Sequence, residues 1–156
     1  MLPPLISTSR LSLPLWTAPD VAAIRSGERL PGWHDDFPRE DDVDAATMWA
    51  EGDPWSSRSV VYAGLVAGSI GFYGPPDGEP LEVEVGYGLI GPARGRGLMT
   101  EALTALVAAV DLEGVRVRAS VSPTNRESLR VLAKCGFTEL RGASEDGELV
   151  MVRPLR

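Results

Sequence analysis

The stretch Gly91-Pro92-Ala93-Arg94-Gly95-Arg96-Gly97-Leu98-Met99-Thr100 forms a glycine-rich turn between a predicted strand and a predicted helix. The first backbone N–H groups of a helix have no partner within it, and the helix dipole adds partial positive charge there. Glycines let an anion approach these N–H groups, and Arg94 and Arg96 can add charge-assisted hydrogen bonds. The stretch therefore predicts an anion-binding turn. On this segment alone, a plain tight turn is the alternative.

The residues of this turn differ from two common phosphate-binding motifs. A dinucleotide-binding motif of the Rossmann type would have glycine where Thr100 stands, and a P-loop would have Gly-Lys followed by Ser or Thr. We expect the turn itself to hold the anion, through Arg94, Gly95, Arg96, Gly97, Leu98, Met99 and Thr100.

The elements on either side of the turn have the clearest periodic patterns. In residues 81–89 apolar residues alternate with Glu82 and Glu84, which predicts a strand with one apolar face and one partly charged face. In residues 97–114 apolar residues recur at helical spacing, and Gly114 ends the pattern. The turn is therefore expected to join a strand to a helix.

The other predicted elements complete an α+β domain. They are, in chain order, strand 10–15, helices 20–27 and 44–51, strands 60–63 and 65–73, strand 115–121, a helix opened by Pro123-Thr124-Asn125 and ended by Gly136, and strands 137–141 and 148–153. Pro14 predicts that the first strand lies at a sheet edge. The order of the elements predicts a mixed central sheet flanked by helices.

Length and composition predict a single soluble domain over residues 1–156. Hydrophobic residues make up 44% of the 156 residues and charged residues 24%, as in ordinary globular proteins. No apolar stretch reaches the roughly 18 residues of a membrane span. The first ten residues also lack the basic and apolar blocks of a signal peptide. We therefore expect a cytoplasmic protein with no membrane partner.

The counts of cysteine, histidine and charged residues exclude several classes. One cysteine cannot form an internal disulfide, and one histidine cannot build a metal cluster, so we expect no metal. The formal net charge of -7 argues against nucleic acid as a partner and suits a cationic substrate better.

Four ordered segments resemble the GNAT superfamily of acyl-CoA-dependent N-acyltransferases, and within it the RimJ/RimL-like branch. The pyrophosphate motif Gln/Arg-x-x-Gly-x-Gly/Ala is matched by Arg94, Gly97 and, less closely, Met99, and the branch's Glu-Ala pair follows at Glu101-Ala102. The other segments are Thr8-Ser9-Arg10-Leu11, Glu84-Val85-Gly86-Tyr87, and Asn125-Arg126-Glu127-Ser128 through Lys134-Cys135-Gly136-Phe137. Together they span nearly the whole chain.

The resemblance implies acetyl coenzyme A (acetyl-CoA) as co-substrate and a GNAT-like fold that holds it. The sheet would open between strand 81–90 and strand 115–121, with the pantetheine arm of CoA in the gap. Backbone groups of Leu89 and Ile90 would pair with the arm, and Asn125 would hydrogen-bond it from the other side. An N-cap role without ligand contact is the alternative for Asn125.

Acetyl transfer to an amine requires a base, a donor to the carbonyl oxygen and a proton for the leaving sulfur. Glu84 is the candidate base, and like-charge repulsion from Glu82 on the same strand face would favour its proton uptake. The alternative is that both glutamates are simply solvated residues of the strand. A backbone N–H near Leu89 would meet the carbonyl oxygen. The resemblance implies Ser128 as the proton donor, because Leu132 stands where the wider superfamily often has tyrosine; a surface helix residue is the alternative for Ser128.

Four other residues could in principle carry chemistry. We expect Cys135 to pack in the core, since a helix C-terminus disfavours a thiolate, and His34 to be solvated in an acidic loop. Trp33 or Trp55 could line an acceptor pocket, with packing in the core or at its rim as the alternative for both.

The sequence thus predicts an acetyl-CoA-dependent N-acetyltransferase. Its acceptor would be a primary amine, on a protein N-terminus or a small molecule, that attacks the thioester directly. A non-catalytic acyl-CoA-binding module is the alternative, and a nucleotide-binding protein is a weaker one. The sequence does not determine the acceptor, the acyl-chain preference or whether Glu84 acts through a bridging water. It also leaves the oligomeric state open, with a homodimer among the alternatives.

Overall fold

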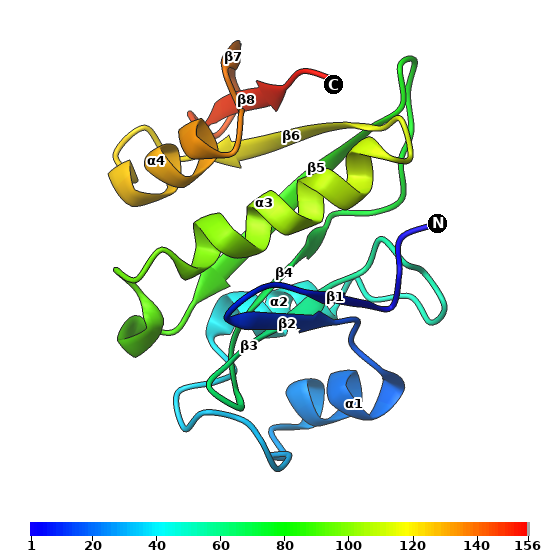
Figure 1. The fold of residues 1–156 in the computed structure, drawn as a ribbon, viewed down its shortest axis with the longest axis vertical. Coiled ribbons are helices and arrows are strands. Elements are labelled where there is room, and N and C mark those ends of the chain that lie inside the picture. Colours follow the sequence, from blue (N-terminus) through cyan, green and yellow to red (C-terminus); the bar gives the residue numbers. More distant parts are fainter. Residues whose placement is uncertain (156) are drawn as a thin grey trace.

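Residues 1–155, which the computed structural model describes, form one mixed sheet with helices on both faces (Figure 1). The eight strands in this part of the chain lie in the order β1-β2-β3-β4-β5-β6-β8-β7. Their bounds are β1 Leu5–Ser7, β2 Leu11–Pro14, β3 Arg58–Tyr62, β4 Leu65–Phe72, β5 Glu82–Leu89, β6 Arg116–Val121, β7 Glu139–Ala143 and β8 Leu149–Arg153. Among these strands β5 and β6 are the one parallel pair. The predicted α+β class is confirmed.

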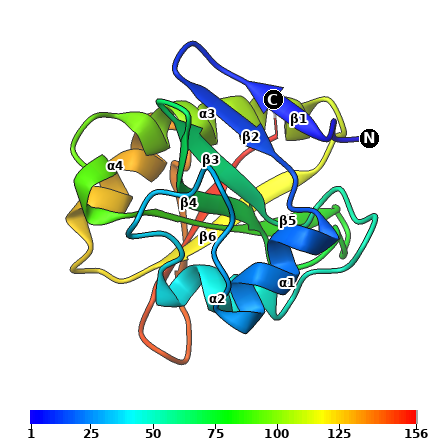
Figure 2. The same cartoon turned by 90° about the horizontal axis from the view of Figure 1, so that it is seen from below.

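The same residues form four α-helices that lie on the two faces of the sheet. They are α1 Ala18–Ser26, α2 Glu40–Ala46, α3 Leu98–Asp111 and α4 Arg126–Lys134, with a short 3₁₀ turn at Gly91–Ala93 before α3. Figure 2 shows α1 and α2 against one face and α3 and α4 against the other. Strand β5 lies in the middle of the sheet, so residues from both pairs of helices can contact it.

Local capping explains where α1 begins and ends. Its N-cap is Thr17, whose side chain accepts from the Asp20 N–H while the Asp20 carboxylate accepts from the Thr17 N–H. The helix ends at Gly27, which adopts the left-handed conformation with a φ of 82°. The predicted end of this helix is confirmed, and its start lies two residues earlier than predicted.

The sheet opens between β5 and β6, as the resemblance implied. These strands pair at three positions only, Glu82 with Arg116, Val83 with Val117, and Glu84 with Arg118. Beyond Glu84, β5 continues to pair with β4 as far as Leu89, while β6 pairs with β8 on its other side. A gap therefore begins at Glu84 and widens toward the glycine-rich turn.

A buried carboxylate holds the closed end of this gap. Glu82 is 7% exposed and accepts from the side chains of Arg116 (2.7 Å), Arg118 (2.7 Å) and Arg141 (2.6 Å). These hydrogen bonds, with Arg141 foremost, lower the pKa of Glu82 to about 2. Arg118 also donates to Glu84 through Nε at 3.2 Å. Arg118 therefore bridges the two carboxylates that the sequence analysis expected to repel each other.

The first strand differs from its prediction. The strand predicted at residues 10–15 is β2, and an additional strand, β1, precedes it and pairs along it with Leu5 opposite Pro14. Pro14 therefore does not lie at the sheet edge, and the edge strand is β1. Three residues are too few for a period-two pattern to be visible, which is why the sequence did not reveal β1.

The second helix is also displaced from its predicted position at residues 44–51. It spans Glu40–Ala46, and its first turn is held by Asp42, which accepts from the backbone N–H of Arg39 at 2.8 Å. Asp42 also accepts from Ser69 on β4. This contact between distant parts of the chain gives no local sequence signal.

The remaining differences are small. Strand β7 begins two residues later than predicted, because the Phe137 N–H donates to Leu132 and so belongs to the end of α4. Cys135 is 7% exposed, which confirms core packing. Among residues 1–155, no helix is both long and apolar enough to cross a membrane.

Candidate active site

The gap between β5 and β6 is lined by backbone groups of alternate β5 residues. The Ile90 N–H donates to the Ala67 carbonyl on the β4 side at 2.9 Å. Neighbouring residues of a strand direct their backbone groups to opposite sides. Tyr87 and Leu89 therefore direct theirs away from β4 and into the gap, where a bound extended arm could pair with them.

This geometry supports one of the two predicted backbone contacts. Both polar backbone groups of Ile90 are already used, since its carbonyl accepts from the Ala93 N–H at 3.1 Å. In this structure Ile90 therefore leaves no backbone group free for the predicted contact with the arm. The Leu89 carbonyl accepts from Nε of Arg94 at 3.1 Å, so the side chain of Arg94 folds back from the turn toward the gap.

The glycine-rich turn presents a row of unpaired backbone donors. The Arg94 N–H donates to Gly91, and the next N–H with a backbone partner is that of Glu101, which donates to Gly97. In the described part of the chain, the N–H groups from Gly95 to Thr100 have no hydrogen-bond partner. Gly95 and Gly97 have φ values of 77° and 74°, a conformation that favours glycine. The turn therefore presents donors that an anion could bind.

Two cavities of about 220 and 240 Å³ run along this turn and share Leu89, Met99, Glu127 and Val131. They form a groove that connects the gap with the turn. Arg94 lines the groove, whereas the Arg96 side chain lines a separate cavity beside Tyr62. The Arg96 side chain thus lies apart from the groove, and its backbone N–H remains in the turn.

Helix α4 brings Asn125 and Ser128 to the other wall of the groove. Oδ1 of Asn125 accepts from the Ser128 N–H at 3.1 Å, so Asn125 is the N-cap of α4. Its side-chain NH₂ group remains for a ligand in the groove. The N-cap role and the ligand role are therefore compatible.

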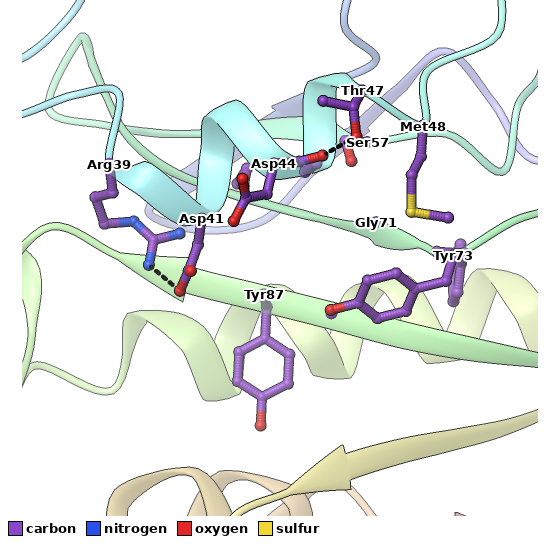
Figure 3. Close-up of a pocket in the computed structure, with 13 residues that line it drawn as sticks. Arg39, Asp41, Asp44, Thr47, Met48, Ser57, Gly71, Tyr73 and Tyr87 are labelled. Carbon is purple, nitrogen blue, oxygen red and sulfur yellow. Dashed lines mark hydrogen bonds and ion pairs between the residues drawn. The ribbon is translucent and has the colours of Figure 1, made fainter. Parts of the chain in front are cut away.

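The structure also places Tyr87 in the site, which the sequence analysis had assigned to the apolar strand face. The Tyr87 hydroxyl lies 2.7 Å from Oγ of Ser128. In Figure 3 the ring of Tyr87 points away from α2 and across the gap. Burial raises the pKa of Tyr87 to about 12, so the phenol keeps its proton at neutral pH. The adjacent Glu-x-Gly-Tyr match was the only sequence signal for this residue.

A cavity of about 540 Å³ lies on the opposite side of β5, under α2 (Figure 3). Its lining residues are Arg39, Asp41, Asp44, Ala45, Thr47, Met48, Ser57, Ser69, Gly71, Phe72, Tyr73, Gly86 and Tyr87. It shares Arg39, Asp41 and Tyr87 with the groove. The cavity and the groove therefore meet beside β5, where a second substrate could reach a group held in the groove.

Arg39 is fixed at this junction. Its guanidinium donates to Asp42, which is fully buried, at 2.7 Å, and Asp42 also accepts from Ser69. A Cβ at Gly88 would lie 2.2 Å from Nη1 of Arg39, so a side chain at this position would force the guanidinium to move. The sequence analysis missed Arg39, because the burial of its partner is a tertiary feature.

Glu84 lies at the closed end of the gap. Its Oε1 accepts from Arg118 (3.2 Å) and Ser120 (3.4 Å), whereas Oε2 has no hydrogen-bond partner within residues 1–155. Glu84 itself does not line the cavity under α2. Tyr73 does, and its hydroxyl would lie 2.5 Å from a Cβ at Gly86, two residues along β5 from Glu84. Burial raises the pKa of Tyr73, with the Glu84 charge as a second cause, so Tyr73 also keeps its proton.

The tryptophans and the histidine lie outside this cavity. Trp33 packs edge-on against Phe37 with ring centroids 5.1 Å apart, and Trp55 packs against Phe72 at 5.4 Å. His34 accepts from the Asp36 N–H through Nδ1. Packing in the core or at its rim is therefore the role of both tryptophans.

Solved structures of acetyltransferases are similar to this fold. An acetyltransferase from Agrobacterium tumefaciens is 23% identical with a TM-score of 0.69, and the match covers 99% of this chain and 96% of that chain. RimJ from Mycobacterium smegmatis, in complex with CoA-disulfide, is 22% identical with a TM-score of 0.69 and coverages of 97% and 89%. Ribosomal-protein-S5-alanine acetyltransferase from Vibrio fischeri is 16% identical with a TM-score of 0.68 and coverages of 97% and 96%. At these identities the similarity concerns the fold.

A search of curated proteins gave no match. The family model described as "Acetyltransferase (GNAT) domain" matches residues 10–138, which include the glycine-rich turn, the β5–β6 gap and α4. Because this match extends over most of the sequence, the chain belongs to the GNAT family of acetyltransferases.

Proposed function

We propose that this acetyltransferase moves the acetyl group of acetyl-CoA to a primary amine that enters through the cavity under α2. The observation that carries the proposal is the meeting of cavity and groove at Tyr87, Arg39 and Asp41. An amine in the cavity can approach a thioester held in the groove without crossing the sheet. Such an arrangement brings the reactants together, which supplies much of the rate of a two-substrate reaction.

The turn fits the phosphates of CoA. Its unpaired N–H groups lie at the N-terminus of α3, where the helix dipole also favours negative charge. The gap beside Leu89 fits the pantetheine arm, because an extended arm can bond to backbone groups as a neighbouring strand would. The Leu89 N–H is then also a fixed donor for negative charge that develops on the thioester oxygen.

CoA and acetyl-CoA should stabilise the fold, because these contacts exist only in the folded state. At a ligand concentration 100-fold above Kd the gain is about 2.7 kcal/mol. Gly97→Asp should abolish the rise in melting temperature, since it places a carboxylate at the turn. The matched control is Gly147→Asp, because Gly147 has a similar φ of 79° in the turn between β7 and β8 and lines neither cavity of the groove. A folded Gly97→Asp protein with unchanged CoA affinity would place the phosphates elsewhere.

The cavity favours a cationic acceptor. Asp41 and Asp44 line it with exposed carboxylates. Arg39 pairs with the buried Asp42 at 2.7 Å and with Asp41 at 3.8 Å, so one positive charge faces three negative ones. Carboxylates at the mouth of a cavity attract cations and repel acidic molecules. An amine that carries a second positive charge, on a small molecule or beside a protein N-terminus, therefore suits this cavity best.

An acetylation panel tests this substrate class. Polyamines, aminoglycosides, N-terminal peptides of differing charge and free amino acids are offered with acetyl-CoA, and CoA release is measured. Cationic acceptors should give the highest kcat/KM, and Asp44→Asn should lower it about threefold to tenfold at low salt. Equal rates with acidic and basic acceptors would contradict the preference. CoA binding without release from any acceptor would favour the non-catalytic module.

Glu84 is the proposed base. Its Oε2 is unpaired, and Arg118 keeps the carboxylate in a fixed orientation through Oε1. Glu84 does not line the cavity, whereas Tyr73 does and lies close enough to Glu84 for the Glu84 charge to raise its pKa. The proposed path of the amine proton to Glu84 therefore runs through Tyr73 or a water beside it rather than by direct contact.

Glu84→Gln should lower kcat by about 10²- to 10⁴-fold, the usual effect of a positioned base, and should leave CoA affinity unchanged. The measurement is steady-state kinetics together with CoA titration. Glu139→Gln, at an exposed position of β7, is the control and should behave as wild type. A fall in kcat of less than about tenfold would assign Glu84 an orienting role only.

Ser128 is the proposed proton donor to the leaving sulfur, and Tyr87 is its hydrogen-bond partner. The Tyr87 hydroxyl can hydrogen-bond to the Ser128 oxygen while Ser128 gives up its proton, because the two oxygens lie 2.7 Å apart, and solvent then returns the proton to Ser128. A pKa of about 12 means that Tyr87 loses its own proton only as the pH rises through that value. The pair therefore stays protonated throughout the neutral and mildly alkaline range.

Ser128→Ala should lower kcat by about 10²-fold, and Tyr87→Phe should lower it by a smaller factor. The double variant should be no slower than Ser128→Ala, because the two groups act in series. Between pH 8 and pH 10, loss of the Tyr87 proton should not reduce the wild-type rate, since its pKa is about 12. Full activity of Ser128→Ala would exclude this proton path.

A further inference from the structure

A carboxylate lies beside the proposed phosphate site. Glu101 is in the first turn of α3, and its backbone N–H donates to Gly97 in the glycine-rich turn. An anion at this end of a helix is favourable when the turn is empty. It opposes the binding of a phosphate to the same turn unless its charge is neutralised.

The structure shows how this charge is neutralised. Arg10, which precedes β2, donates to Oε1 of Glu101 through Nε at 2.7 Å and to Oε2 through its backbone N–H at 2.9 Å. Thr8 donates to Oε2 as well. The hydrogen bond from Thr8 and those from Arg10 lower the pKa of Glu101, so the carboxylate is ionised. Both of its oxygens accept hydrogen bonds.

Arg10 also holds the turn itself. Its Nη1 donates to the carbonyl of Arg96 at 3.0 Å. The Arg96 carbonyl and the Gly97 N–H belong to one trans peptide unit, so they point in opposite directions. The hydrogen bond to Arg10 therefore keeps the Gly97 N–H directed away from the guanidinium.

Arg10 contacts the turn from outside the groove. Gly97 lines the groove, and Arg10 is absent from the residues that line its two cavities. Nη2 of Arg10 would lie 3.7 Å from a Cβ at Gly97, so the guanidinium lies close to the turn without entering the groove.

We propose that Arg10 is a positioning residue for the phosphates of acyl-CoA, which neutralises Glu101 and fixes the Gly97 N–H in its donor orientation. The inference rests on the proposed function, because it requires that the turn holds these phosphates. It assigns the segment Thr8–Leu11 a role in co-substrate affinity, although this segment is nearly ninety residues away from the turn in sequence.

Three variants test the role of Arg10, namely Arg10→Ala, Glu101→Gln and the double variant. Arg10→Ala should raise Kd for CoA by about tenfold or more, since it uncovers a charge at the phosphate site. Glu101→Gln should not raise it, because the repelling charge is gone and the amide can still accept from Arg10. The double variant should bind CoA at least about threefold more tightly than Arg10→Ala does. Unfolding midpoints without ligand check that each variant folds.

S-Acetylpantetheine, which lacks the pyrophosphate, is the matched substrate control. Arg10→Ala should change kcat/KM for it by less than about twofold, while it raises KM for acetyl-CoA and leaves kcat nearly constant. Three results would overturn the inference. They are an unchanged Kd for CoA in Arg10→Ala, an equal loss of CoA affinity in Glu101→Gln, and a double variant that binds CoA no more tightly than Arg10→Ala. Wild-type protein that does not bind CoA would instead refute the proposed function.

Discussion

The site depends on the cluster of one buried carboxylate and three arginines at the closed end of the β5–β6 gap. Glu82 on β5 is bound by Arg116 and Arg118 of β6 and by Arg141 of β7. A buried carboxylate is stable only when such partners surround it. The cluster therefore joins the two halves of the sheet at one end and leaves β5 and β6 separate beyond it. Because Arg118 also binds Glu84, the same cluster orients the proposed base at the point where the gap begins.

The two faces of strand β5 contribute to different spaces, the groove beside α4 and the cavity under α2. Tyr87 extends from one face toward α4, where it meets Ser128. On the other face Gly86 and Gly88 carry no side chain, and Tyr73 and Arg39 occupy that space. The alternation of a strand thus places the proposed proton donor on one side and the acceptor cavity on the other. A side chain at either glycine would displace a residue that lines the cavity.

The N-terminal segment and the glycine-rich turn form one unit. The contacts of Arg10 with Glu101 and with the Arg96 carbonyl connect the start of the chain to the start of α3. Helix α3 contacts β1, β2, β5 and β6, so it links the N-terminal strands to the gap. The order of the segments in the sequence gives no indication of this proximity, which arises because β1 and β2 lie across the sheet beside the same helix.

The sequence by itself determined the local features of this protein: the strand–turn–helix around residues 81–111, the helix beginning at Asn125 and the α+β class. These depend on periodicity, on glycine conformations and on capping, which act over a few residues. Only the tertiary structure decided which residues meet. Tyr87 and Ser128 lie 41 positions apart, Arg10 and Glu101 lie 91 apart, and Arg39 owes its place to a buried aspartate bonded to β4. The direction of Ile90 likewise depends on the pairing register of β4 and β5, because that register determines which backbone groups are left for the gap.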